Sequence, residues 1–174
     1  MESLLTNQGV FVGLEASDKK SVLLEMARQA APLVGQTEHA IFDVLWEREC
    51  LATTGIGRGI AIPHGRLEGM DQVQGLFARL AHPVAFDAVD DQPVDLVMML
   101  LAPSHAGADH LKALSWASHL MRDSRLCQKL RNAKGSTEIC RLIRAAGQML
   151  LRSHAHEDED DMMTTSPRLL RAVG

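Results

Sequence analysis

The chain has 174 residues, of which 46% are hydrophobic and 23% are charged, as is typical of one globular domain. No apolar run reaches the roughly 20 residues of a membrane-spanning helix, and the first residues lack the basic start of a secretory signal. Residues 157–161 supply five of the 22 acidic residues, so the rest of the chain is nearly neutral. With four Phe, two Trp and no Tyr, this body lacks the basic stripe and the aromatic side chains of nucleic-acid binding. We therefore expect a cytoplasmic protein that binds neither nucleic acid nor a membrane.

The cysteines agree with a cytoplasmic location. They are three in number and show no C-x-x-C spacing, which favours reduced thiols. Cys127 and Cys140 lie on apolar helix faces and are expected to be buried. No cluster of ligands has the spacing of a zinc site, so we expect neither a metal nor a cofactor.

The first third of the chain predicts a short strand and two helices. Residues 10–14 indicate the strand. Ser17 is a suitable N-cap, and apolar residues follow it at helical spacing until Gly35, which predicts the first helix between them. Thr37 caps a second helix that ends in the turn containing Arg48.

The remaining elements are three buried strands and three helices. The strands are expected at residues 60–62, 73–80 and 94–101, where short apolar runs occur, and Pro103 stops the last of them. The helices are expected at about 109–121, from Asp123 onward, and after Gly135-Ser136. Strands interleaved with helices indicate a layered α/β or α+β domain.

The last residues differ in composition from the rest. The helical pattern ends near Leu151, and a polar, acidic segment without periodicity follows. We therefore expect one domain over residues 1–151 and a mostly disordered acidic tail over residues 152–174.

A glycine-rich segment followed by a histidine is the most informative part of the sequence. Gly55, Gly57 and Gly59 precede a short apolar run, and His64 stands between Pro63 and Gly65. The G-x-G-x-G spacing is followed by a strand rather than a helix, so it is neither a Walker A loop nor a dinucleotide fingerprint. On these residues alone, a tight turn and a histidine bonded to backbone at a strand end are the plainer interpretations.

The residues around this segment extend the pattern into a family resemblance. The chain resembles the IIA proteins of the bacterial phosphoenolpyruvate-dependent phosphotransferase system, in the mannitol/fructose branch. The resemblance rests on Arg48-Glu49, Thr54–His64, residues 83–87 and 92–96, and His110 with Leu111, Leu114 and Ser115. It covers residues 10–148, and residues 85–87 and 91–95 look most like the nitrogen-regulatory members. It implies a mixed central β-sheet flanked by helices.

The resemblance also implies a site. In that family the histidine of the Ile-Pro-His motif accepts a phosphoryl group from a phosphohistidine on a small carrier protein. On this chain the acceptor would be His64, the supporting arginine Arg48, and the second histidine His110. Phosphoryl transfer needs positioning and charge neutralisation, which a planar guanidinium and a neutral imidazole supply.

Neighbouring residues are expected to support the phosphate. The hydroxyl of Thr54 could donate a hydrogen bond, and the N–H groups of residues 55–59, with Gly55, Gly57 and Gly59 among them, could form an anion-binding nest. Arg58 and Arg66 are expected to be surface charges that steer an acidic or phosphorylated partner.

These observations predict a histidine phosphocarrier of the nitrogen-regulatory phosphotransferase system that controls unknown target proteins through its phosphorylation state. It would be a monomer or a weak homodimer. Two alternatives stay open, a sugar-transport IIA component that donates to a separate IIB domain and a non-catalytic regulatory binding module. The joint presence of His64, Arg48 and His110 argues against the second. The sequence does not indicate which ring nitrogen of His64 would react.

Overall fold

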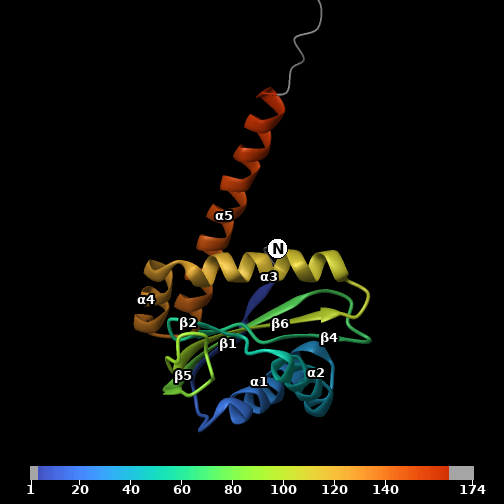
Figure 1. Ribbon diagram of the computed structural model, residues 1–174, viewed down its shortest axis with the longest axis vertical. Helices are drawn as coiled ribbons and strands as arrows, with labels where there is room; N and C mark the ends of the chain where they lie inside the picture. The colour runs from blue at the N-terminus through green and yellow to red at the C-terminus, as the bar shows by residue number, and fades with distance from the viewer. Residues whose placement is uncertain (1–3, 165–174) are drawn as a thin grey trace, which may run out of the picture.

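The protein is a mixed α/β structure in which one six-stranded sheet lies between two layers of helices (Figure 1). The computed structural model describes residues 4–164, with side chains described through residue 152. The elements are β1 (Leu5–Leu14), α1 (Lys19–Val34), α2 (Glu38–Leu51), β2 (Gly55–Gly57), β3 (Ile60–Ala61), β4 (His64–Leu67), β5 (Gln74–Val84), β6 (Val94–Pro103), α3 (Gly107–Arg122), α4 (Ser124–Asn132) and α5 (Ser136–Thr164). The central mixed sheet flanked by helices confirms the expected fold class.

The sheet is built around β6. Its strand order is β1-β5-β6-β3-β2, and β4 also pairs with β6. β5 runs antiparallel to β6, whereas β3 and β4 both run parallel to it, at Ile60 beside Leu96 and at His64 beside Leu100. β3 and β4 therefore lie end to end along one strand. Pro63 lies in the interruption between them, and its carbonyl still accepts a hydrogen bond of 2.9 Å from the Leu100 N–H.

The core is divided into two halves by the sheet. Both faces of β6 are buried, because side chains alternate between the two faces of a strand. Leu96 and Met98 pack with α3, α4 and α5 on one face, and Val97 and Met99 pack with α1 and α2 on the other. Cys127 and Cys140 are buried, as predicted, whereas Cys50 is exposed.

The helix caps agree with the prediction except at the N-terminus of α1. Gly35 ends α1 and Thr37 caps α2, as predicted. The N-cap of α1 is Asp18 rather than Ser17, because Ser21 lies three residues after Asp18 and completes a capping box. The Asp18 carboxylate accepts from the Ser21 N–H at 2.7 Å, and the Ser21 hydroxyl accepts from the Asp18 N–H at 3.0 Å.

The strands differ from the expectation in number and length. β1 begins at Leu5 rather than at residue 10, and β2 and β4 were not predicted. β2 contains two glycines, and β4 contains a histidine, a glycine and an arginine among its four residues, so neither shows the apolar pattern of a strand. Both form because β3 and β6 offer unpaired edges.

The end of the chain continues α5 beyond the last residue of the predicted domain. α5 reaches Thr164 and projects from the body (Figure 1), and the acidic tail over residues 152–174 stays a prediction. No glycine or proline occurs between residues 148 and 166, and so no backbone feature ends the helix at residue 151. Residues 165–174 lie outside the described residues. Within the described part of the chain, no helix combines the length and the apolar character needed to cross a membrane.

Candidate functional site

The structure places His64 at the first position of β4 with its ring held by two hydrogen bonds. Nδ1 lies 2.9 Å from the carbonyl oxygen of Ile62. Because a carbonyl can only accept, Nδ1 carries the hydrogen and Nε2 carries the lone pair. The Nε–H of Arg48 donates to that Nε2 at 3.0 Å, which requires the same tautomer. The lone pair of the His64 ring is therefore on Nε2, which faces a guanidinium group.

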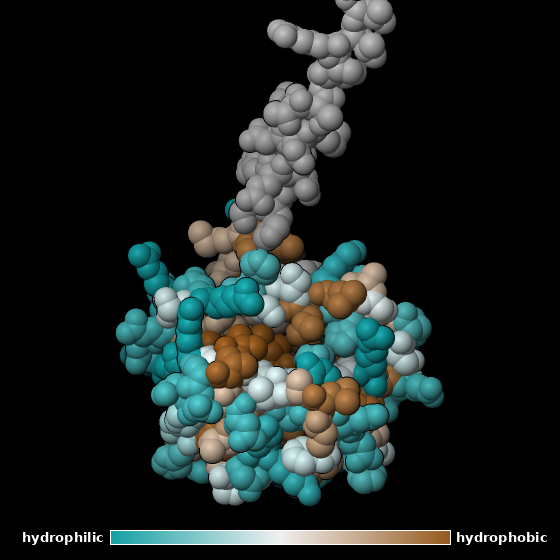
Figure 2. All heavy atoms as spheres, viewed as in Figure 1, coloured by the Kyte–Doolittle hydropathy of each residue, from teal (hydrophilic) through white to brown (hydrophobic). Residues whose placement is uncertain are grey.

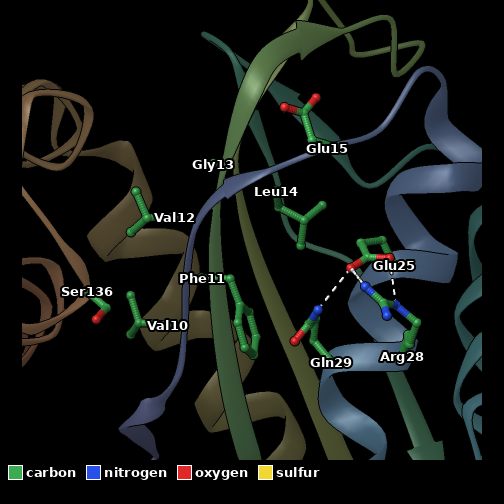
Figure 3. Close-up of a pocket in the computed structure, with 10 residues that line it drawn as sticks. All are labelled: Val10, Phe11, Val12, Gly13, Leu14, Glu15, Glu25, Arg28, Gln29 and Ser136. Atoms are coloured by element: carbon green, nitrogen blue, oxygen red, sulfur yellow. Dashed lines mark hydrogen bonds and ion pairs between the residues drawn. The ribbon is translucent and has the colours of Figure 1, made fainter.

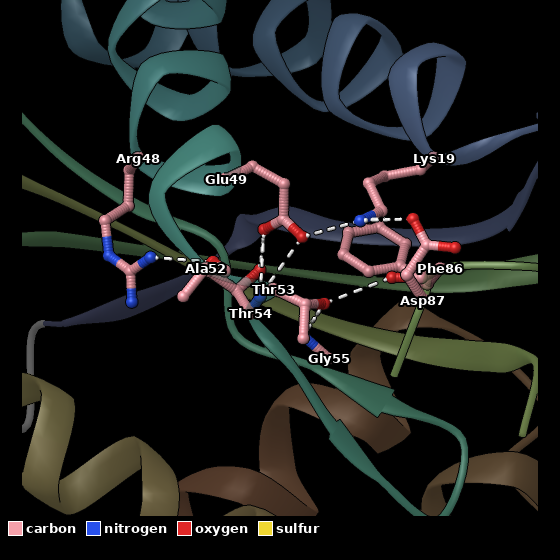
Figure 4. Close-up of polar contacts among 9 residues, drawn as sticks. All are labelled: Lys19, Arg48, Glu49, Ala52, Thr53, Thr54, Gly55, Phe86 and Asp87. Carbon is pink, nitrogen blue, oxygen red and sulfur yellow. Dashed lines mark hydrogen bonds and ion pairs between the residues drawn. The ribbon is translucent and has the colours of Figure 1, made fainter. Parts of the chain in front are cut away.

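Arg48 is held in the last turn of α2. Its Nη1 donates to the carbonyl oxygen of Ala52 at 2.8 Å, which also satisfies a carbonyl just past the helix end (Figure 4). α2 approaches β4 closely because Gly65 has no side chain. A Cβ at Gly65 would lie 2.7 Å from Cγ2 of Val44 on α2. This close packing brings the Arg48 guanidinium within reach of His64.

His110, at the start of α3, completes the cluster. Its ring lies edge-on to that of His64, with 5.6 Å between the ring centroids. The Nε–H of Arg66 donates to His110 Nδ1 at 2.9 Å, so the hydrogen of His110 lies on Nε2. That Nε2 is buried and has no hydrogen-bond partner among the described residues. A buried donor without a partner is costly, and it is a feature typical of a ligand site.

The surroundings favour the neutral form of both imidazoles. Burial lowers the pKa of His64 and, together with the charges of Arg48 and Arg66, outweighs the hydrogen bond to Ile62 and the charge of Glu49, which raise it. Burial also lowers the pKa of His110, with smaller contributions from His64 and Arg66. Both rings are therefore neutral at pH 7, and His64 Nε2 is available as a nucleophile.

Thr54 does not face this cluster with a free hydroxyl. Its hydroxyl donates to Oε2 of Glu49, and its N–H donates to both carboxylate oxygens of Glu49, at 3.0 and 3.1 Å (Figure 4). Thr54 is itself buried. The predicted hydrogen bond from this hydroxyl to a phosphate is therefore replaced by one within the protein.

The glycines form a hairpin rather than an open loop. Gly55, Gly57 and Gly59 shape the β2–β3 turn, in which Gly59 has a φ of 79°. The N–H of Gly55 donates to the Thr53 hydroxyl at 3.1 Å, and the N–H of Arg58 donates to Asp90 at 2.8 Å. Two donors of the predicted anion nest are thus already used inside the protein.

Two residues near His64, Arg66 and Glu49, make contacts that the sequence did not predict. Arg66 was expected to steer partners, but it contacts His110; it lies two residues after His64 on one strand, a spacing that puts both on one face. Arg58, the other arginine expected to steer partners, does not contact His110; it donates to the carbonyl of Arg122 at the end of α3, at 3.4 Å. Glu49 is 5% exposed, and only the tertiary structure shows its partners.

Outside this cluster, we examined the described residues for a metal site and for a hollow that could hold a ligand. No group of three or more His, Cys, Asp or Glu in the described part of the chain is arranged to hold a metal ion. A hollow of about 610 Å³ lies between β1 and α1, lined by residues 10–15, Glu25, Arg28, Gln29 and Ser136 (Figure 3). Three of its polar side chains bond to one another, because Arg28 and Gln29 both donate to Glu25.

Comparison with known proteins agrees with this fold. The profile of the phosphoenolpyruvate-dependent sugar phosphotransferase system, EIIA 2 family matches residues 3–146, and the chain belongs to that family. The family resemblance expected from the sequence is thereby confirmed. The protein is thus a IIA-type component of a phosphotransferase system.

Its relatives include nitrogen regulatory proteins. The chain is 48% identical over 136 residues to the nitrogen regulatory protein of Bradyrhizobium diazoefficiens, covering 78% of this chain and 89% of the relative. The crystal structure of nitrogen regulatory protein IIA-Ntr from Neisseria meningitidis is 31% identical, with a TM-score of 0.77 over 82% of this chain and 97% of that one. The IIA mannitol structure from Escherichia coli, at 21% identity and a TM-score of 0.67 over 80% and 98% of the two chains, shares the fold.

Proposed function

We propose that this protein is a histidine phosphocarrier in which His64 Nε2 accepts a phosphoryl group from a phosphohistidine on a small carrier protein. The observation that carries the proposal is the fixed tautomer of His64, with Nδ1–H on the Ile62 carbonyl and the lone pair on Nε2, where the Arg48 N–H now occupies the place that phosphorus would take. As Nε2 gives its electrons to phosphorus, positive charge develops on the ring. The bond from Nδ1–H to the carbonyl stabilises that charge. The donor nitrogen keeps the electron pair of the N–P bond that breaks.

The neighbours of His64 fit the charge of the group being transferred. Arg48 would move its Nε–H bond from the ring to the phosphoryl oxygens, and its planar fork suits two of them. His110 Nε2–H, which now lacks a partner, would donate to a third oxygen. Such transfer depends on positioning and charge neutralisation rather than on further covalent chemistry.

The surface beside the site suits a protein donor. Leu51 follows Arg48 by three residues and is 79% exposed, and Leu111 follows His110 directly and is 63% exposed. The face drawn in Figure 2 also exposes apolar side chains near its centre, with polar side chains around them. Exposed apolar area of this kind is typical of docking surfaces. We infer that the donor docks over Leu51 and Leu111.

The output that we propose is regulatory. The relatives named nitrogen regulatory protein support this reading over sugar transport, which would require a separate IIB domain. A phosphate adds a charge of about −1.5 to −2 at His64, enough to change which target proteins bind this surface. We propose that the protein acts in the cytoplasm as a monomer or weak homodimer.

Phosphoryl transfer from labelled phosphoenolpyruvate, through the two general proteins of the system, tests the proposal. We expect acid-labile, base-stable label on the wild type and on His39→Ala, which changes an exposed histidine of α2, but not on His64→Ala. Label on His64→Ala at the wild-type rate would contradict the assignment. Absence of label from all three proteins would favour the binding module.

A further inference from the structure

Glu49 is the buried carboxylate next to the site, and its contacts are unusually complete for an acid. It lies on α2 directly after Arg48 and is 5% exposed. Besides the three bonds from Thr54, it accepts from Nζ of Lys19 at 3.1 Å (Figure 4). Lys19 also pairs with Asp87 at 2.8 Å and lies over the ring of Phe86. One carboxylate thus joins α1, α2 and the start of the β2–β3 hairpin.

A chain of hydrogen bonds continues from Thr54 to the imidazole ring of His64. The carbonyl of Thr54 accepts from the Ile62 N–H at 2.9 Å. The carbonyl of Ile62 then accepts from His64 Nδ1 at 2.9 Å. Each bond fixes the position of the peptide that makes the next one. Because Arg48 precedes Glu49 on the same helical turn, both hydrogen-bonded nitrogens of His64 depend on this part of α2.

Stability alone is a poor explanation for this arrangement. A buried ion pair seldom stabilises a protein more than well-packed apolar side chains of the same volume, because both charges lose their hydration. Directional bonds to a carboxylate do, however, define geometry. In phosphoryl transfer, where catalysis is mostly positioning, a misplacement of about 1 Å costs on the order of 100-fold in rate.

We propose that Glu49 is a positioning residue for phosphoryl transfer: by holding Thr54 it holds the Ile62 carbonyl, and thereby fixes His64 with its hydrogen on Nδ1 and its lone pair on Nε2. The role of Glu49 in phosphoryl transfer rests on the proposed function. The effect on the His64 ring does not, because the tautomer is a property of the unphosphorylated protein.

Four variants test the proposal. Glu49→Gln keeps the shape but leaves one acceptor oxygen and adds N–H donors beside Thr54 and Lys19. Thr54→Val removes the hydroxyl, and Thr54→Ser keeps it. Glu25→Gln is the matched control, since Glu25 is also a carboxylate paired with a cation but has no bonded path to His64. Each variant is compared with the wild type by ¹⁵N NMR of the His64 ring, by thermal unfolding, and by the rate of label uptake.

We expect Glu49→Gln and Thr54→Val to show a mixture of His64 tautomers and transfer slowed by about tenfold or more. Thr54→Ser and Glu25→Gln should match the wild type in both readouts. The proposal is overturned if Glu49→Gln and Thr54→Val lower only the melting temperature and keep the wild-type tautomer and rate. Should Glu49→Gln not fold, Thr54→Val decides by the same criteria. If the wild type itself takes up no label, the proposed function fails, and the NMR comparison alone decides the role of Glu49.

Discussion

At the scale of single residues, the direction of two hydrogen bonds determines which ring nitrogen of His64 carries the lone pair. Ile62 accepts from Nδ1 and Arg48 donates to Nε2, so the ring is bound as one tautomer. His110 is oriented in the opposite sense, with Arg66 donating to Nδ1 and the hydrogen on Nε2. The two histidines therefore present a lone pair and a hydrogen, which are the two groups that an incoming phosphoryl group needs.

Arg66 is predicted to act through His110. Arg66→Ala removes the donor to His110 Nδ1, so the His110 ring should populate both tautomers and transfer should slow by about tenfold. Arg66→Lys should restore part of the rate, since an ammonium group also donates. NMR of the His110 ring together with label uptake provides the measurement. Arg58→Ala is the control, and a wild-type His110 ring in Arg66→Ala would contradict the assignment.

The lowered pKa values predict the response to pH. Burial, more than the nearby charges, holds the pKa of His64 and of His110 below the ordinary value of 6.5. The unfolded chain therefore binds protons at a higher pH than the folded one, so the stability from these neutral rings is fully present above about pH 6.5. It is lost as the pH falls through the folded values. We expect the melting temperature to fall over this window, and to fall less in His64→Gln. Equal slopes for the two proteins would contradict the expectation.

At the scale of elements, the close contact between α2 and β4 sets the distance between Arg48 and His64. Gly65→Ala would place a methyl group 2.7 Å from Val44, whose β-branched side chain has little rotamer freedom in a helix. We expect a loss of about 1–3 kcal/mol in unfolding free energy, together with slower transfer. The double variant Val44→Ala/Gly65→Ala makes room for the methyl group and should recover much of both. Denaturant unfolding and label uptake measure the recovery, and its absence would show that the glycine is needed for another reason.

The elements also show what a sequence can predict. α1, α2 and β6 were predictable because their apolar spacing and their caps are local signals, and His64, Arg48 and His110 were predictable because they lie in a motif. β2 and β4 were not, since their pairing depends on edges offered by β3 and β6 rather than on their own residues. The contacts of Glu49 were hidden for the same reason, because its partner Lys19 lies 30 residues away on another helix.

At the scale of the whole molecule, the folded body ends within the first half of α5. Among the residues of α5 whose side chains the structure describes, the last one packed against the core is Leu150, and Ile139, Cys140 and Ile143 are buried. Deletion of residues 153–174 is therefore expected to leave the melting temperature and the rate of label uptake close to those of the full chain. A fall of more than a few degrees, measured by thermal unfolding, would show that the deleted residues support the body.

The central claim, that His64 Nε2 carries the phosphoryl group, is tested most directly by identifying the atom to which the group is attached. The protein is phosphorylated from phosphoenolpyruvate through the two general proteins, and ³¹P and ¹⁵N NMR are recorded on the product. The account predicts one phosphohistidine, at position 64, with phosphorus bonded to Nε2 and the hydrogen still on Nδ1. Phosphorus on Nδ1 of His64, or on any other residue, would contradict it.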